Sequence, residues 1–234
     1  MQTIALRLTT AAHGGVCRLA LREVRGEDEL AVDGIDTRAA LRLIDRLVDS
    51  ADTDAPSANA LCASDRDRLL AAVYRHAWGD TISATPTCIR CGQPFDLSFS
   101  LAALQRHLDA QRVDDATQVV PVGHDELAAA DLPWDDGIAL LKTAAANAAP
   151  ERLDSVAPLL DVDVEARCPE CDNVQLAAFD IQSFLLASLL NERAALLQDV
   201  HLLASSYGWP LHEILMLSRT ERRALVAIID EERR

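Results

Sequence analysis

Lysine is almost absent from this chain, and aromatic residues are scarce. Lys142 is the only lysine, so arginine supplies nearly all basic side chains, and aromatic residues make up 4% of the sequence. Leu, Ala, Val and Ile must therefore build the core, which a hydrophobic share of 50% allows. The formal net charge of −15 disfavours a nucleic-acid backbone or an anionic membrane as the main partner.

Long hydrophobic runs are missing too. Runs such as Phe184–Ala187 are far too short to span a bilayer. Residues 1–10 contain no basic segment followed by an apolar one, as a secretion signal would. We therefore expect no membrane partner and a cytoplasmic location.

Signatures of catalysis are equally absent. The chain has no GxSxG, Walker or dinucleotide-binding glycine pattern, and its histidines form neither a HExxH motif nor a close pair. The neighbours His124–Asp125 and His212–Glu213 are the best acid–base candidates, and surface histidines at helix starts account for both. We expect no catalytic residues, no enzymatic activity and no small-molecule substrate.

Two CxxC pairs are the most informative feature that is present. Four thiolates can close a tetrahedral zinc site and leave no open coordination position, which favours a structural metal over a catalytic one. Without a secretion signal, paired CxxC spacing also favours metal over disulfides. We predict structural zinc held by Cys88, Cys91, Cys168 and Cys171.

Cysteine has two other common roles in proteins, redox chemistry and packing in the core. A redox CxxC of the thioredoxin type occurs singly at a helix start, whereas Pro94 and a predicted strand follow the first pair here. Cys17 and Cys62 stand alone, and each is expected to be a small buried hydrophobe. A reactive thiol therefore remains a weaker alternative to a metal site.

An internal repeat surrounds the two pairs. Phe99 and Phe179 each follow the second cysteine of their pair by eight residues, and each precedes a helix-capping residue, Ser100 or Asp180. Both halves read as strand, CxxC turn, strand, cap and helix, which is how a zinc ribbon is built. The 76 residues between Cys91 and Cys168 exceed the usual ribbon gap of roughly 15–20 residues. The intervening segment must therefore fold separately, with its ends close together.

Hydrophobic periodicity predicts an α+β chain that is mainly helical, with a split zinc ribbon, N-terminal β elements and a C-terminal helical hairpin. Alternation suggests strands over residues 1–31 with a turn at His13–Gly15, followed by helices at 37–48 and 64–78, the second of them capped by Ser64. Between the cysteine pairs we expect a short strand at Val119–Val120 and a helix near 136–147. A long helix is predicted over 181–206. Pro210 is expected as the first residue of a short helix, and residues 218–221 form a capping box for the final helix. We divide the chain into 1–62, 63–180 with an insert at 113–160, and 181–234.

The C-terminal region carries more leucine than one buried helical face needs. A helix-turn-helix DNA reader is one interpretation, but acidic residues offset the arginines of its last helix. A helical hairpin that packs on the core or on a partner is the other. Surplus apolar surface favours a partner-binding face. Its predicted contact residues are Tyr207, Trp209, Ile214 and Leu215.

The same region resembles a known protein group. The stretch 199–217 (DVHLLASSYGWPLHEILML), followed by TERR at 220–223, is similar to the ending of small tail and baseplate proteins of contractile phages and related injection systems. The segment 64–75, with Gly79–Asp80 and residues 88–101, also resembles these proteins, which are similar to the T-even-type baseplate hub and hub-assembly-chaperone family. The resemblance covers residues 64–101 and 165–230.

This resemblance implies a non-enzymatic structural or assembly protein of a tail baseplate, with other baseplate or tail proteins as partners. Whether the chain is a permanent component or an assembly chaperone stays open, as do its stoichiometry and the roles of the N-terminal strands and the insert. The alternative hypothesis is a zinc-ribbon nucleic-acid-binding or transcription adaptor.

Overall fold

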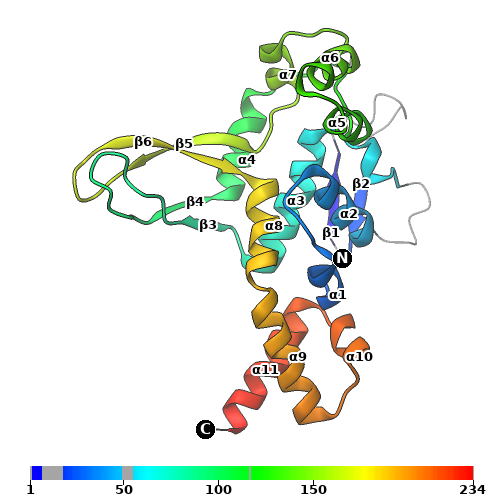
Figure 1. The fold of residues 1–234 in the computed structure, drawn as a ribbon, viewed down its shortest axis with the longest axis vertical. Helices are drawn as coiled ribbons and strands as arrows, with labels where there is room; N and C mark the ends of the chain where they lie inside the picture. The colour runs from blue at the N-terminus through cyan, green and yellow to red at the C-terminus, as the bar shows by residue number, and fades with distance from the viewer. Residues whose placement is uncertain (1, 7–17, 49–54, 116, 234) are drawn as a thin grey trace.

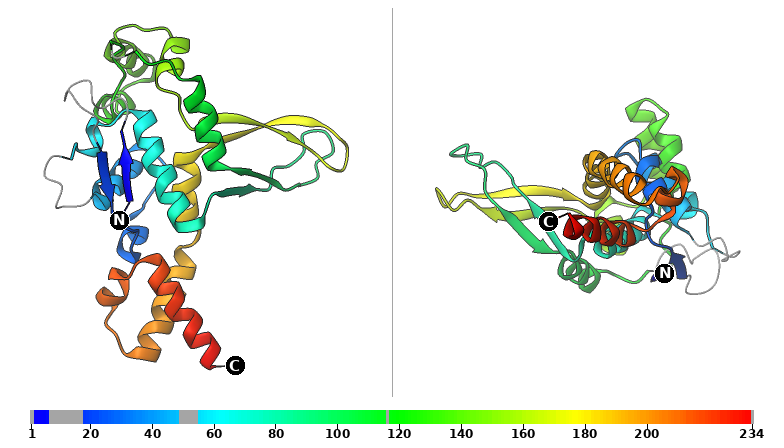
Figure 2. Two further views of the ribbon diagram at one scale, coloured as in Figure 1. Left: turned by 180° about the vertical axis from the view of Figure 1, so that it is seen from behind. Right: turned by 90° about the horizontal axis from the view of Figure 1, so that it is seen from below.

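The structure is a computed structural model, and it describes residues 2–6, 18–48, 55–115 and 117–233. It is an α+β protein, mainly helical, whose described strands form three small antiparallel sheets of two strands each. The body lies in the middle of the long axis, three short helices lie at one end, and the C-terminal helices lie at the other (Figure 1). Two β-hairpins project sideways from the body in every view (Figure 2).

The body forms around the N-terminal strands and three helices. β1 (Gln2–Ala5) pairs antiparallel with β2 (Arg18–Leu21), and α2 (Thr37–Leu47), α3 (Ala63–Trp78) and α8 (Ile181–Asn191) pack with them. Asp36 caps α2 by accepting a hydrogen bond from the Ala39 N–H at 2.8 Å. Gly79 ends α3 with φ of 91°, a conformation that glycine adopts without steric cost. Leucines from these elements fill the largest buried cluster, as the composition predicts.

Each projecting hairpin begins and ends at this body. β3 (Thr81–Ala84) pairs with β4 (Leu97–Ser100), and β5 (Asp161–Arg167) pairs with β6 (Val174–Asp180). Ser100 caps α4 (Leu101–Gln111) and Asp180 caps α8, as predicted. The register repeats as well, because Ile82 lies opposite Phe99 and Val162 lies opposite Phe179. The rings of Phe99 and Phe179 meet edge to face at 5.0 Å where the two hairpins join the body.

The segment between the hairpins folds against the start of α3. It contains α5 (Gly123–Ala130), α6 (Trp134–Ala144) and α7 (Pro150–Val156). The Val113 N–H donates to the Ser155 carbonyl at 2.7 Å, which brings the two ends of the segment together. The Gly123 N–H donates to the Leu61 carbonyl at 2.8 Å. The segment is therefore attached to the body by its backbone as well as by packing.

The C-terminal helices form a second apolar cluster. α9 (Arg193–Tyr207), α10 (Leu211–Met216) and α11 (Arg219–Glu232) bury residues such as Leu203 and Ile214 against one another. α1 (Gly26–Ala31) contributes the partly buried Leu30 to the same cluster. The predicted capping box at the start of α11 is present, since the Ser218 and Glu221 side chains bond reciprocally to backbone N–H groups.

Several predicted elements are wrong. Residues 26–31 form α1 rather than a strand, and Val119–Val120 form no strand. The 181–206 helix is interrupted at Glu192, whose carboxylate accepts from the Trp78 indole at 2.9 Å. Ser64 does not cap α3, because Cys62 occupies the N-cap position and the Ser64 hydroxyl donates to the Pro158 carbonyl instead.

Three helices, α1, α5 and α7, were not predicted, and Pro210 takes the N-cap position of α10 rather than its first turn. The predicted turn at His13–Gly15 lies outside the described residues, as does Cys17.

Candidate metal centre

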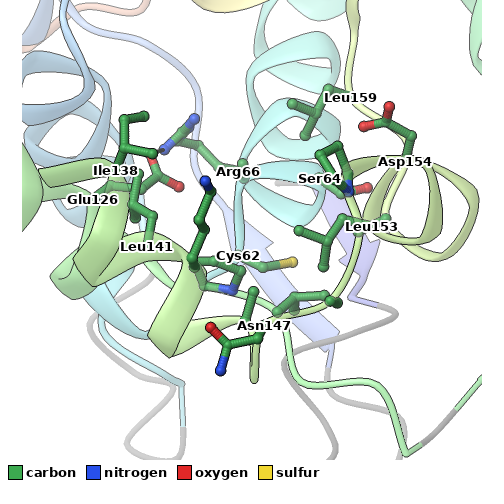
Figure 3. A pocket seen from close by; sticks show the side chains of 18 residues that line it. Cys62, Ser64, Arg66, Glu126, Ile138, Leu141, Asn147, Leu153, Asp154 and Leu159 are labelled. Carbon is green, nitrogen blue, oxygen red and sulfur yellow. Dashed lines mark hydrogen bonds and ion pairs between the residues drawn. The ribbon is translucent and has the colours of Figure 1, made fainter. Parts of the chain in front are cut away.

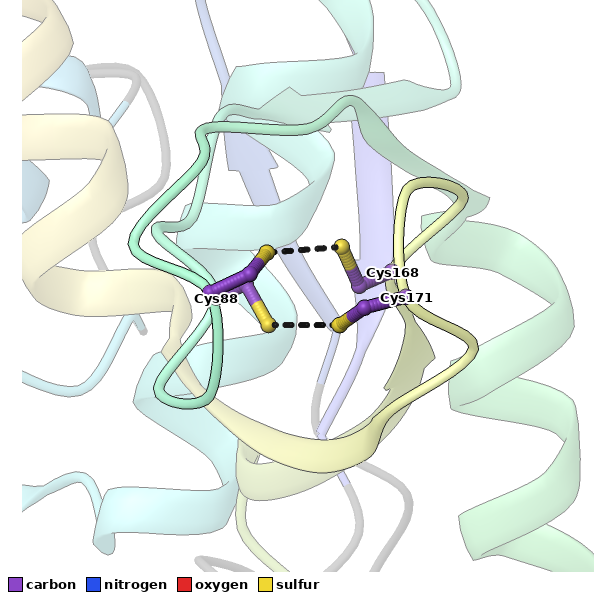
Figure 4. A group of neighbouring side chains, drawn as sticks. Cys88, Cys168 and Cys171 are labelled. Atoms are coloured by element: carbon purple, nitrogen blue, oxygen red, sulfur yellow. Dashed lines mark hydrogen bonds between the residues drawn. The ribbon is translucent and has the colours of Figure 1, made fainter.

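The four predicted metal ligands meet at the tips of the two hairpins. Each CxxC forms the turn of its hairpin, and the two turns face each other with their sulfur atoms between them (Figure 4). All four sulfur atoms lie within 4.8 Å of one another. Two cysteine pairs with 76 residues between them therefore share one site.

The two turns have the same local structure. In the first, the Cys88 N–H donates to the Gln93 carbonyl and the Gly92 N–H donates to the Cys88 carbonyl, each at 2.9 Å. In the second, Cys168 N–H donates to Asn173 at 2.9 Å and Asp172 N–H donates to Cys168 at 3.0 Å. Gly92 and Asp172 both have positive φ, 73° and 56°. Every one of these positions is matched at a separation of 80 residues.

The distances fit a metal and exclude disulfides. The Cys88 and Cys171 sulfurs lie 3.6 Å apart, and those of Cys91 and Cys168 lie 3.7 Å apart. A disulfide requires about 2.05 Å between sulfurs. A tetrahedral ion with metal–sulfur bonds of about 2.3 Å separates its ligand atoms by about 3.8 Å. The cluster can therefore hold a metal ion with little movement of the side chains.

The protonation of the free thiols is uneven. The Cys91 backbone N–H points at the Cys88 sulfur and lowers the pKa of that thiol to about 6. Although the Asn173 N–H favours the Cys171 thiolate, burial and the neighbouring thiols outweigh it and raise the pKa of Cys171 to about 12. Four thiolates this close repel one another, so full ionisation requires a cation at the centre.

The amide of Gln175 ties the two turns together. From the start of β6, its carbonyl oxygen accepts from the Ile89 N–H at 2.9 Å, and its amide group donates to the Thr87 carbonyl at 3.1 Å. Gln175 is 9% exposed, so both bonds are shielded from water. A bridge of this kind orients metal ligands without touching the ion. Sequence reasoning missed it, since a glutamine four residues after a CxxC carries no signal in a single sequence.

No open coordination position is left in this arrangement. Cys88 and Cys168 are buried, and Phe95 and Ala166 pack against them. Four sulfur ligands complete a tetrahedron, so a metal here binds no substrate and activates no water. The site can stabilise the two hairpins, and this is the chemistry that its geometry supports.

Comparison with known proteins adds no family. No family model, curated protein or solved structure matches the chain. The residues themselves must therefore carry any functional conclusion.

The predicted partner-binding residues separate into two groups. Tyr207 and Trp209 stack with ring centroids 5.1 Å apart and are 38% and 37% exposed, so they lie at the surface. Ile214 is fully buried and Leu215 is half-buried in the C-terminal cluster. Ile214 therefore belongs to the core of the C-terminal cluster and is not accessible to a partner in this conformation.

The other residues considered for chemistry are two histidines and Cys62. His124 and His212 are both exposed. Cys62 is buried, as predicted, and desolvation raises the pKa of its thiol to about 12, so it is not a reactive nucleophile. Among the described helices, none has the length and apolar character needed to cross a membrane.

Proposed function

We propose that the four cysteines bind structural zinc and that the two hairpins together form a split zinc ribbon. The convergence of two CxxC turns with matching hydrogen bonds and sulfur spacings near 3.7 Å carries this proposal. Structural zinc sites of this kind release most of their binding free energy as folding free energy. Iron also takes four thiolates, so the identity of the metal needs direct measurement.

Cys88→Ser tests the metal site, with Cys62→Ser as the matched control because Cys62 is a buried thiol outside the cluster. We expect the native protein to contain one zinc ion per chain by elemental analysis. Cys88→Ser should lose that zinc together with thermal stability, whereas Cys62→Ser should keep the zinc. A metal-free native protein of full stability would contradict the proposal, and a coloured iron protein would correct the metal.

We propose further that the chain is a structural or assembly protein of a contractile tail or injection-system baseplate. Its support is the resemblance of residues 64–101 and 165–230, together with the aromatic surface at the end of α9. Tyr207 and Trp209 stack there, and Leu211 and Met216 are also exposed, at 55% and 47%. Exposed aromatic and Met residues are typical of protein interfaces.

A second observation favours protein over DNA as the partner. Arg219 and Arg222, which a DNA-reading last helix would need to expose, are 4% and 1% exposed and donate to Glu29. They are therefore unavailable to phosphates. Tight DNA binding with a steep salt dependence would reverse this proposal in favour of the transcription adaptor.

The baseplate assignment is tested on neighbouring genes and on one side chain. Sheath, tube and spike genes should flank the reading frame, and co-expression with the encoded hub proteins should yield a complex in gel filtration. Trp209→Ser should dissociate that complex, whereas Trp134→Ser should not, although Trp134 is 81% exposed. A gene neighbourhood without tail genes, or a complex that stays intact with Trp209→Ser, would contradict the assignment.

A further inference from the structure

A cavity of about 710 Å³ lies between the N-terminal end of α3 and the helices of the 113–160 segment (Figure 3). A cavity of this size is typical of small-molecule sites. Most of its lining is apolar. α6 contributes Leu141 and α7 contributes Leu153. Cys62, directly before α3, and Leu159, shortly after α7, also line the cavity. Nothing in the metal centre or at the aromatic surface uses this cavity.

One wall carries a buried arginine with an unused donor. Arg66 is 7% exposed and pairs with Glu126 at 2.5 Å, so Glu126 contributes little net charge to the cavity. The Arg66 Nε donates no hydrogen bond to any described residue, but it lies 3.9 Å from a carboxylate oxygen of the buried Asp67. Arg66 thus contributes a buried guanidinium to this wall, and Glu126 and Asp67 already interact with it.

The cavity is also lined by Lys142, the only lysine of the chain. Lys142 is exposed and has no ion-pair partner within the described ranges, whereas many arginines of this acidic chain have one. Asp154 on α7 also lines the cavity and is exposed on the side away from Glu126 (Figure 3). An unpaired ammonium beside an apolar cavity complements an anionic head group on an apolar body.

We propose that this cavity binds an amphipathic monocarboxylate, with its hydrocarbon body against the apolar wall and its carboxylate at Lys142 near Arg66. Asp154 opposes this anion weakly, because its own charge is solvated. Lys142 and Asp154 therefore act on the ligand with opposite signs. Substitution of each residue therefore tests the charge of the ligand, which a purely structural role of either residue would not reveal.

Decanoate is the probe, and isothermal titration calorimetry with the metal-loaded full chain is the measurement. We expect saturable binding of one decanoate per chain. Lys142→Gln should weaken it about tenfold, the weight of one charge-assisted hydrogen bond. Asp154→Asn should strengthen binding or leave it unchanged. Arg233→Gln removes the same charge from the distant C-terminal end of the chain and should leave the affinity unchanged.

Decanol and decylammonium complete the experiment. Decanol should bind more weakly than decanoate and equally to the native chain and to Lys142→Gln. Equal decanoate affinity in the native chain and in Lys142→Gln would overturn the proposal. A preference for decylammonium that Asp154→Asn abolishes would overturn it in favour of a cationic ligand, and absence of saturable binding by all three probes would overturn it outright.

Discussion

Asp67 is a buried acid with an unusual setting. It is 4% exposed on α3 and accepts a hydrogen bond from the Leu160 N–H at 2.9 Å, where β5 leaves the body. Desolvation raises the pKa of Asp67 to about 7, although Arg66 and the Leu160 N–H favour its charged form. The folded protein therefore holds a proton that the unfolded chain releases near its ordinary pKa of about 4.

This difference predicts a pH dependence with a definite sign. Because the folded state binds more protons than the unfolded state between about pH 4 and about pH 7, Asp67 reduces the free energy of unfolding as pH rises through that window. Asp67→Asn keeps an acceptor for Leu160 and carries no charge. The free energy of unfolding of Asp67→Asn, minus that of the native chain, should rise across the window by up to a few kcal/mol and then stay constant at higher pH.

Urea unfolding followed at intervals from about pH 4 to about pH 8 measures this difference. Asp230→Asn is the control, since Asp230 is exposed on α11 and the substitution removes the same charge outside α3 and β5. A constant difference between Asp67→Asn and the native chain across the window would contradict the prediction.

Glu29 is a second buried acid, and it joins distant parts of the chain. It accepts from Arg219 at 2.9 Å and from Arg222 at 2.6 Å, and its side chain is 2% exposed. Glu29→Gln leaves two buried guanidinium groups without their shared carboxylate. We expect a loss of about 3–5 kcal/mol in the free energy of unfolding.

Chemical denaturation checks this value against Glu27→Gln as the control. Glu27 is more exposed and lies 3.9 and 4.0 Å from Arg22 and Arg46, so its loss should cost less than about 1 kcal/mol. Similar costs for the two variants would show that burial of the Glu29 pairs does not contribute to stability.

At the scale of elements, the CxxC turn is the repeated unit. Its geometry demands a residue of positive φ directly after the second cysteine, which is Gly92 in one hairpin and Asp172 in the other. A methyl group added at Gly92 would meet no atom within 4 Å. Any cost of Gly92→Ala therefore comes from the backbone conformation alone.

Gly92→Ala should reduce the free energy of unfolding by about 1–2 kcal/mol, the cost of a left-handed residue with a Cβ. Gly34→Ala is the control, because a methyl group there would meet only Asp36 at 4.0 Å. The two midpoints of thermal unfolding give the comparison. Equal midpoints would mean that the turn relaxes to another conformation.

The elements also show what the sequence could predict. The CxxC spacing and the matching positions of Phe99 and Phe179 predicted the paired hairpins, because these signals are local and repeated. Helix caps at Ser100, Asp180 and Ser218 were predicted for the same reason. The interruption at Glu192 was not, since it depends on the Trp78 indole and on arginines far along the chain.

The candidate cavity could not be predicted from the sequence. Its walls come from α3 and from the 113–160 segment, in which two of the three helices were not predicted. Short helices of seven or eight residues give too few turns for a clear apolar period. Lys142 stood out by composition alone, and only the fold places it at an apolar cavity.

The whole molecule consists of parts with separate cores. The cysteine cluster lies at the hairpin tips, the body cluster lies at the bases of the hairpins, and the C-terminal cluster lies beyond α8. Separate cores predict separate responses to metal removal. A chelator should loosen the hairpins while leaving the C-terminal helices intact.

Amide hydrogen exchange before and after chelation measures this response. Protection should fall in β3, β4, β5 and β6, because the tips lose the ion that would crosslink them and are left with the hydrogen bonds of Gln175. Protection in α9 and α11 should change little, since most of their contacts are with each other, α1 and α10, and none of the described contacts involves the hairpin tips. A uniform loss of protection would mean that the ion supports one cooperative unit instead.

The 80-residue separation of the half-sites also imposes an order on synthesis. At about 5–20 residues per second, a ribosome adds Cys168 roughly 4–16 s after Cys88. During that delay the nascent chain carries two of the four sulfur ligands. If the site binds a metal as proposed, its completion is a late event in translation, because Cys168 and Cys171 are added only after the whole intervening segment.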